Sequence, residues 1–314
     1  MRILKSKITL ALAGLLATLI ALTLLFPTQA AETGIALERA RAGLELKTLQ
    51  VSGIEVAYLE GGHGEPLLLI HGFGSNKDNW TRVSGYLTPQ FHVYAIDLPG
   101  FGDSSKPADW RYRIQDQVEY VHTIAQALGL QRMHLGGSSM GGQIAASYTA
   151  RYPNEVASLW LNAPAGVASA EPSEMFKQIA LMKPGDRMPL LSQTPEDFPQ
   201  VFDMMFVDPP FVPAFVVHYL GERAAANFKL HERIFTELRT ESIPLENLMG
   251  GLPTPTRIVW GEQDRVLHAS GAKILAGLMP NASVLLLPDT GHLPMMERTK
   301  VVAEDYLSFR AALK

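Results

Sequence analysis

The chain has 314 residues, of which 47% are hydrophobic and 18% are charged, and its formal net charge is −4. This length and composition allow a large buried core and argue against wholesale disorder, while the lack of a basic block argues against nucleic acid as a partner. Cysteine is absent, so no disulfide framework, thiolate nucleophile or cysteine-based metal site is possible.

The N-terminal stretch has the properties of a membrane segment. Basic residues come first, followed by the uncharged run Ile8–Phe26, which is nineteen residues long and holds eight leucines. A helix of that length reaches about 28 Å, close to the hydrocarbon thickness of a bilayer. We therefore expect a single-pass transmembrane anchor within residues 1–29. A cleaved signal peptide is the alternative, because Ala30 could end a cleavage site.

Charge around this run predicts which side of the membrane the protein occupies. Arg2, Lys5 and Lys7 lie only on the N-terminal flank, which should stay cytoplasmic. We expect the body on the non-cytoplasmic side, which is the periplasm in a bacterium, or secreted if the segment is cleaved. The small-residue stripe Ala13, Ala17 and Ala21 would allow a homodimer through this helix, although alanine is also simply common in such helices. Residues 30–46 are expected to form a juxtamembrane helix.

From Lys47 onward, short β-like runs alternate with helical stretches. This alternation predicts an α/β core with a parallel sheet and crossover helices, which we place in residues 47–163 and 252–314. An opening hairpin should turn at Ser52 and Gly53. Later strands are expected at Leu67–Ile70, Phe91–Asp97, Arg132–Gly136, Val156–Asn162, Thr256–Gly261 and Ser283–Leu287.

A glycine-rich loop, His71 to Gly74, follows the first central strand. In an acyl-transfer enzyme this position supplies one backbone N–H of the oxyanion hole, here that of Phe73. The second N–H comes from the residue after the nucleophile, here Met140. We expect His71 to brace the loop without touching the substrate. Asp97, after the next strand, is expected to fix its own loop rather than to act in catalysis.

The stretch from Gly137 to Gly141 fits the G-x-S-x-G pattern of a nucleophile elbow, a sharp turn from strand to helix. The nucleophile of such a turn has an unfavourable backbone conformation, and small residues two before and two after it let strand and helix approach. These requirements favour Ser139 as the nucleophile. Ser138 competes, but Met140 would then occupy a position that needs a small residue. Alone the motif is weak, because a glycine-rich loop can match it by chance.

An acid and a base follow two later strands. Asp264 comes after Thr256–Gly261, and His292 comes after the last strand. Open α/β sheets place their chemistry at these strand ends, and the order Ser, Asp, His is that of α/β-hydrolases. Asp289 competes as acid but is too near His292 in sequence to lie on a neighbouring loop. His268 competes as base but begins a helix just after Asp264.

Residues 164–251 interrupt the alternation of strands and helices. An insertion of this length between two strands is usually functional and often a lid. It holds six of the twelve methionines and most of the phenylalanines, which together make an adaptable apolar surface suited to acyl chains. The alternative is that these residues form the small core of a cap. We expect both interpretations to hold in part.

Five stretches resemble the membrane-anchored α/β-hydrolases, a group that contains monoacylglycerol lipases and bacterial lipases or phospholipases A with an N-terminal transmembrane helix. These stretches are His71–Trp80, Asp97–Ser105, Gly136–Gly142, Ile258–Ala272 and Gly291–Arg298. The resemblance implies an α/β-hydrolase fold with a mostly parallel eight-stranded sheet, an inserted helical cap and an N-terminal transmembrane helix. The chain departs from this group at Ser138, where relatives often carry His, Asn or Thr, and at Thr299, where proline is usual.

The resemblance also implies a mechanism. Ser139 would attack an ester carbonyl, His292 would take its proton and Asp264 would orient the imidazole, with the amides of Phe73 and Met140 holding the oxyanion. No cofactor or metal is expected, and a lipid-like ester or a fatty acid should occupy the cap pocket. Two alternatives remain: an exported hydrolase of small non-lipid substrates, such as a carboxylesterase or a carbon–carbon bond hydrolase, and a non-catalytic binding protein on the same fold.

Overall fold

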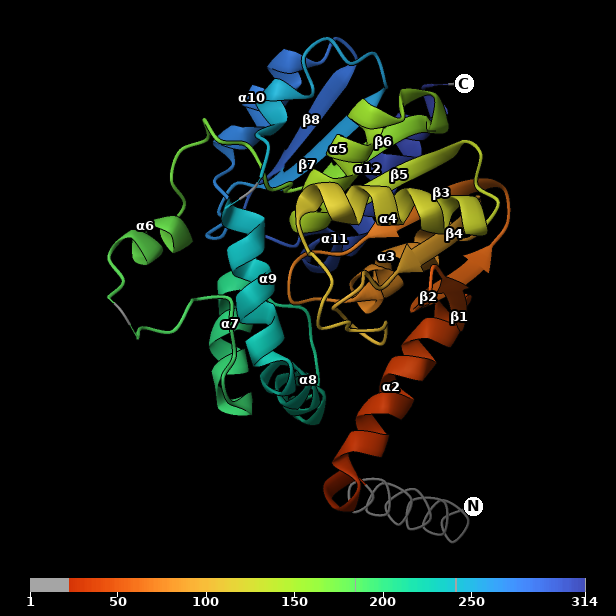
Figure 1. Cartoon of the computed structure of the whole chain (residues 1–314). Coiled ribbons are helices and arrows are strands. Elements are labelled where there is room, and N and C mark those ends of the chain that lie inside the picture. Colours follow the sequence, from red (N-terminus) through yellow and green to blue (C-terminus); the bar gives the residue numbers. More distant parts are fainter. Residues whose placement is uncertain (1–22, 184, 241, 314) are drawn as a thin grey trace, which may run out of the picture.

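The computed structural model describes residues 23–183, 185–240 and 242–313. In these ranges the strands form an eight-stranded sheet in the order β1-β2-β4-β3-β5-β6-β7-β8 (Figure 1). The pairs β1–β2 and β2–β4 are antiparallel and the others are parallel, so the expectation of a mostly parallel eight-stranded sheet is confirmed. The strands are β1 (Leu44–Val51), β2 (Ile54–Gly62), β3 (Glu65–Ile70), β4 (Phe91–Ile96), β5 (Met133–Ser138), β6 (Val156–Asn162), β7 (Thr256–Gly261) and β8 (Ala282–Leu287).

The first helix and the opening hairpin differ from their expected bounds. Strands β1 and β2 pair as the predicted hairpin, with positive φ angles at Ser52 and Gly53. However, β1 begins at Leu44, and helix α2 (Pro27–Arg41) starts and ends earlier than the expected helix 30–46. Proline suits the first turn of a helix. At the other end Gly43 adopts a φ of +71°, the left-handed conformation that commonly ends helices.

Apolar strands are buried between two layers of helices. Helices α4 (Ile114–Ala127), α5 (Met140–Arg151) and α10 (Ser270–Leu278) share one hydrophobic core with the sheet, and α3 (Thr81–Leu87) and α12 (Thr299–Ala311) share the other (Figure 1). The side chains of β3 from Leu67 to Ile70 are fully buried. Strands covered on both faces are continuously hydrophobic, and this is why these short runs could be read as strands.

The C-terminal helix is interrupted. Helix α11 (Pro294–Glu297) ends two residues before α12 starts at Thr299. Between them Arg298 has φ −121° and ψ 45°, which is not helical. The remaining short helical turns are η1 (Lys77–Trp80), η2 (Pro153–Glu155), η3 (Pro195–Asp197) and η4 (Leu245–Asn247).

Residues 164–251, which we call the cap segment, leave the sheet after β6 and return to it at β7. They contain α6 (Glu174–Ala180), α7 (Phe198–Met205), α8 (Ala214–Ala226) and α9 (Phe228–Thr240). Helices α7, α8 and α9 gather below one end of the sheet, and α6 stands away from them (Figure 1). Helix α2 packs on α8, where Ala31, Val216 and Tyr219 form a small apolar cluster.

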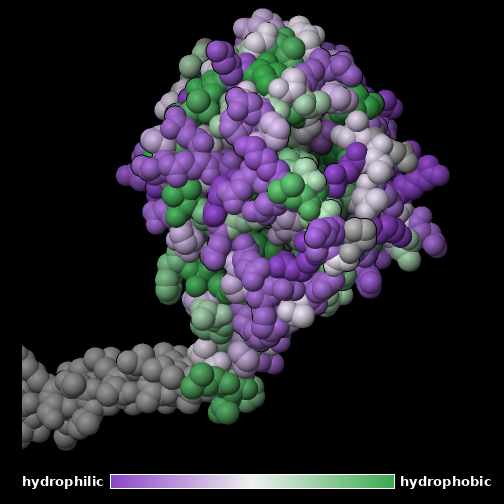
Figure 2. Space-filling model, turned by 90° about the vertical axis from the view of Figure 1, so that its left-hand side faces the viewer, coloured by the Kyte–Doolittle hydropathy of each residue, from purple (hydrophilic) through white to green (hydrophobic). Residues whose placement is uncertain are grey.

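The expected membrane segment lies mostly outside the described residues, as does the stripe Ala13, Ala17 and Ala21. Of the helices in the ranges given above, none has the length and hydrophobicity needed to cross a bilayer. Residues 23–26 are described and precede α2. Leu24, Leu25 and Phe26 are exposed there, and Figure 2 shows apolar side chains gathered at that end of the molecule.

Candidate active site

Ser139 lies in a strained turn between β5 and α5. Its φ is 54° and its ψ is −120°, a conformation that non-glycine residues adopt mainly at functional sites. A Cβ atom on Gly137 would lie 2.2 Å from the carbonyl oxygen of Gly141, and a Cβ atom on Gly141 would lie 2.3 Å from that of Ile70. Only glycine fits at both positions, which is the steric requirement that the G-x-S-x-G pattern predicts.

The two adjacent serines have different surroundings. Ser138 is fully buried, and its hydroxyl has no hydrogen-bond partner in the described part of the chain. Ser139 is partly exposed and lines a large cavity. The structure therefore presents Ser139, rather than Ser138, to a ligand.

Asp264 and His292 meet at the ends of β7 and β8. The Nδ1 atom of His292 lies 2.8 Å from Oδ2 of Asp264, and both side chains are buried. Oδ1 of Asp264 accepts hydrogen bonds from the amides of Val266 and Leu267 at 2.8 and 2.9 Å, and Oδ2 accepts another from the Trp260 indole at 3.0 Å. These donors stabilise the carboxylate and fix the direction in which it faces the imidazole.

The competing acid and base are engaged elsewhere. Asp289 accepts a hydrogen bond from the side chain of Gln263 at 3.1 Å, on the exposed surface. The Nδ1 atom of His268 lies 2.9 Å from the hydroxyl of Ser270. His292 thus pairs with Asp264, the acid that its position after a strand had favoured.

The loop that carries Phe73 runs directly past Ser139. A Cβ atom on Gly72 would lie 3.0 Å from the Cβ of Ser139 and 3.7 Å from its Oγ. Met140 is the first residue of α5, and the first amides of a helix have no partner within that helix. Gly72 and Met140 therefore both lie beside Ser139, and the amides of Phe73 and Met140 are the candidates for an oxyanion hole.

His71 braces this loop from below, as predicted. It is fully buried, its Nε2 accepts a hydrogen bond from the amide of Leu98 at 3.1 Å, and its Nδ1 lies 2.7 Å from the carbonyl oxygen of Gly72. Burial lowers the pKa of His71, which keeps the ring neutral. A neutral ring that donates from Nδ1 and accepts at Nε2 satisfies both contacts.

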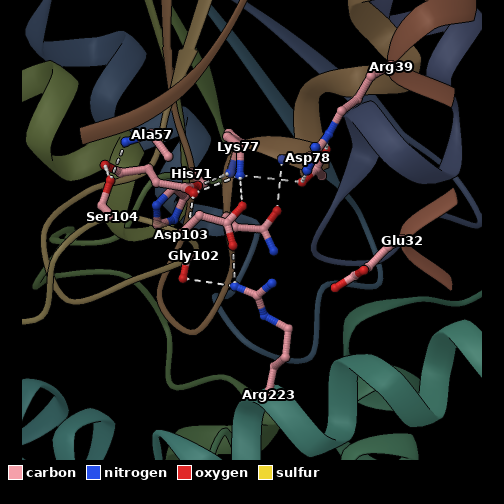
Figure 3. Close-up of polar contacts among 12 residues, drawn as sticks. Glu32, Arg39, Ala57, His71, Lys77, Asp78, Gly102, Asp103, Ser104 and Arg223 are labelled. Atoms are coloured by element: carbon pink, nitrogen blue, oxygen red, sulfur yellow. Dashed lines mark hydrogen bonds and ion pairs between the residues drawn. The ribbon is translucent and has the colours of Figure 1, made fainter. Parts of the chain in front are cut away.

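A buried network of charges ties this loop to the next one (Figure 3). The ammonium group of Lys77 lies 2.8 Å from Asp97 and 2.6 Å from Asp103, and the Lys77 amide donates to Asp97 at 2.7 Å. The amide of Asp103 donates to the same Asp97 carboxylate at 2.7 Å. The expected loop-fixing role of Asp97 is confirmed. Burial opposes ionisation of Asp103, but Lys77 and Arg223 hold its pKa well below its usual range.

Two surrounding helices join this network. Arg223 of α8 donates to Asp103 at 2.5 Å and to the Gly102 carbonyl oxygen at 2.9 Å (Figure 3). Arg39 of α2 forms a two-pronged bond with Asp78, with both distances at 2.6 Å. Sequence reasoning did not single out Arg39, Lys77 or Arg223. Lys77 lies inside a recognised motif, but its partners are distant in sequence, and no local sequence pattern indicates which residues they are.

A cavity of about 620 Å³ opens above Ser139 and His292. This volume lies within the range typical of small-molecule sites. Helix α7 has no buried residue, because its apolar side chains face this open space. Apolar residues that line the cavity from the cap segment include Phe198, Val201, Phe202, Met205, Phe215, Val216 and Leu220. In the parts of the chain described, no group of three or more histidine or acidic residues could hold a metal ion.

Comparison with known proteins places the chain in a family. Residues 65–299 match the family described as alpha/beta hydrolase fold. The chain therefore belongs to the α/β-hydrolase family, in agreement with its sheet order and with the turn at Ser139.

Its relatives include lipases. Lipase 3 of Moraxella sp. (strain TA144) is 38% identical over 282 residues, which cover 88% of each chain. Monoacylglycerol lipase ABHD6 of Homo sapiens is 31% identical over 259 residues, covering 80% of this chain and 77% of that one. The crystal structure of a membrane phospholipase A, described as a bacterial virulence factor, is 42% identical with a TM-score of 0.88, covering 98% of this chain and 99% of that chain.

Proposed function

We propose that the protein is a serine carboxylic ester hydrolase that acts on lipid esters. The observation that carries this proposal is the placement of Ser139 and the buried Asp264–His292 pair on one large cavity with apolar walls. The similar proteins, which are named as a lipase, a monoacylglycerol lipase and a phospholipase A, support the same substrate class.

The residues suggest an acyl-enzyme mechanism. Ser139 Oγ attacks the ester carbonyl while His292 accepts its proton, and Asp264 holds the imidazole and stabilises its charged form. The amides of Phe73 and Met140 stabilise the oxyanion of the tetrahedral intermediate. When this intermediate collapses, His292 returns the proton to the leaving alcohol. Water, activated by the same histidine, then hydrolyses the acyl-enzyme and releases a fatty acid.

The cap segment would bind the acyl chain. Its phenylalanines and Met205 give the cavity an apolar wall, and methionine and phenylalanine adapt to flexible chains. Covalent labelling by a fluorophosphonate and hydrolysis of p-nitrophenyl esters of increasing chain length test this function. No labelling would favour a binding protein, and a preference for acetate over medium or long chains would favour a hydrolase of small substrates.

We also propose that residues 1–29 anchor the enzyme in a membrane with residues 47–163, 164–251 and 252–314 on the non-cytoplasmic side. The length and flanking charge of Ile8–Phe26 support this topology, and the similar solved structure is described as a membrane phospholipase A. Two copies could then associate through the stripe Ala13, Ala17 and Ala21. Carbonate washing of membranes with N-terminal sequencing tests the anchor; a soluble protein that begins at Ala31 would instead be secreted.

A further inference from the structure

Glu297, at the end of α11, connects the loop of His292 to the cap segment. Its Oε2 atom accepts a hydrogen bond from the amide of Gly291 at 2.8 Å. Its Oε1 atom accepts two more, from the amides of Val207 at 3.1 Å and Asp208 at 2.7 Å. One carboxylate thus joins two backbone segments that are far apart in the sequence.

The same two segments are in direct contact beside the catalytic histidine. The amide of His292 donates to the carbonyl oxygen of Met205 at 2.7 Å. A Cβ atom on Gly291 would lie 2.6 Å from that oxygen and 2.9 Å from the Cα of Phe206, so the backbones lie as close as glycine allows. Arg298 adds bonds to Asp208 at 2.9 Å and to the carbonyl oxygen of Asp289 at 2.7 Å.

The catalytic rate should depend more on the position of the His292 ring than on that of its neighbours. Its ring must keep Nδ1 on Asp264 while Nε2 serves Ser139, and a displacement of about 1 Å in a catalytic group can cost about 10²-fold in rate. The loop between β8 and α11 receives part of its support from residues 205–208, which belong to the cap segment. The carboxylate of Glu297 accepts hydrogen bonds from the backbones of both segments at this point, and Arg298 also bonds to both.

We propose that Glu297 is a positioning residue that keeps His292 in its productive place by clamping its loop to the end of α7. The inference rests on the proposed function, because it assigns His292 the role of base. The clamp requires that both oxygens of the side chain accept hydrogen bonds. Glutamine has the same shape but only one acceptor oxygen, so it can serve Gly291 or the pair Val207 and Asp208, but not both.

The test compares Glu297→Gln with Glu304→Gln in the full chain purified in detergent. Glu304 lies on α12, is largely exposed and pairs with Lys300 at 3.7 Å. For each protein we would measure kcat and KM on a medium-chain p-nitrophenyl ester and the rate at which a fluorophosphonate modifies Ser139. Active-site titration counts competent sites, so that misfolded protein does not lower the apparent kcat.

Glu297→Gln should lower kcat and the modification rate by about tenfold or more, with KM changed less than twofold, and Glu304→Gln should match the wild type. Unchanged kcat and modification rate per competent site, with only a lower melting temperature, would overturn the inference. Glu297→Asp keeps both acceptors and should lose less activity than Glu297→Gln; the reverse order would assign the effect to side-chain volume. A wild-type protein without hydrolysis or labelling would instead refute the proposed function.

Discussion

We call Ser139 and the loops that hold Asp264 and His292 the catalytic floor, and we call α7 the wall of the cavity. The two regions differ in how tightly their side chains are packed. In the floor, close backbone contacts fix the turn at Ser139, and buried hydrogen bonds hold the side chains of Asp264 and His292 in place. In α7 no residue is fully buried: Phe198, Phe202 and Met205 line the cavity, and Phe202 and Met205 also pack against the hydrophobic core. On the proposed function, the reacting groups therefore lie in a packed structure, whereas the substrate would be selected by a half-buried apolar surface.

Several contacts join the two regions. Glu297 and the amide of His292 bond to residues at and just after the end of α7, and Arg265 bonds to the carbonyl oxygens of Asp203 and Phe206. Farther away, Arg223 of α8 bonds to Asp103. Changes in the floor should consequently abolish turnover for every substrate. Changes in the wall should alter which substrates are accepted, and changes at the connections should affect stability or rate without changing selectivity.

The largest effect is expected in the floor. Ser139→Ala should lower kcat by about 10⁶ if the triad acts as a unit and should abolish covalent labelling by a fluorophosphonate. Ser138→Ala is the matched control and should still be labelled, because its hydroxyl is buried behind the turn. Labelling that persists in Ser139→Ala and disappears in Ser138→Ala would move the nucleophile to the other serine.

Asp264→Asn should lower kcat by about 10⁴. The asparagine amide would face the indole of Trp260 and Nδ1 of His292, both of which donate to Oδ2 in the wild type, so the imidazole would be held in the wrong tautomer. Loss of the buried bonds should also cost about 1–3 kcal/mol of stability, seen as a lower melting temperature. Asp289→Asn provides the comparison: a larger loss of kcat there would make Asp289 the acid.

Lys77→Met tests the buried network beneath the floor. Removing the ammonium group leaves Asp97 and Asp103 without their shared partner, and breaking a buried ion pair in this way costs about 3–5 kcal/mol. Chemical denaturation measures this directly. Lys47→Met removes an exposed partner of Glu60 and should have a much smaller effect, because solvent screens an exposed ion pair. Equal losses in the two variants would show that the network around Lys77 is not stabilising.

Lowering the pH should destabilise the protein through His231, a buried residue of the cap segment. This residue of α9 stacks on Phe101, and burial lowers its pKa to about 4, while an unfolded histidine titrates near 6.5. Below pH 6.5 the unfolded chain binds the extra proton, so stability falls as the pH falls toward 4 and is fully present above 6.5. Between pH 7 and 5 the contribution of His231 is about 2 kcal/mol.

His231→Phe preserves the aromatic contact and removes this titration. Denaturation midpoints measured at pH 7 and pH 5 should therefore differ less in His231→Phe than in the wild type. Other buried histidines, such as His71, are present in both proteins. The comparison is therefore between the two slopes of denaturation midpoint against pH. An identical slope in the two proteins would contradict the assignment.

The smallest effect is expected in the wall. Phe202→Ala should lower kcat/KM for long-chain esters by about tenfold, since loss of apolar contact with a chain is worth about 1–3 kcal/mol, and should leave acetate esters unchanged. Phe176→Ala on α6 is the control, because Phe176 is exposed and does not line the cavity. A uniform loss across chain lengths would show that Phe202 supports the floor rather than selecting the chain.

Local patterns were enough for much of the framework. Fully buried strands such as β3 read as continuous apolar runs. The glycines around Ser139 express a steric constraint that operates within five residues. For the same reason His71 and Asp97 could be assigned bracing roles, because each stands at a strand end where a loop needs support.

Only the tertiary structure decided the connections between distant segments. Arg223 meets Asp103, and Glu297 meets Val207 and Asp208, at sequence separations of 89 to 120. The pairing of Leu44 with Gly61 likewise extends β1 and shortens the helix before it. Such contacts depend on how the cap segment and α2 fold back over the sheet. A lone charged side chain in a sequence does not specify its partner, because the partner is chosen by proximity in space, and that proximity exists only once the chain is packed.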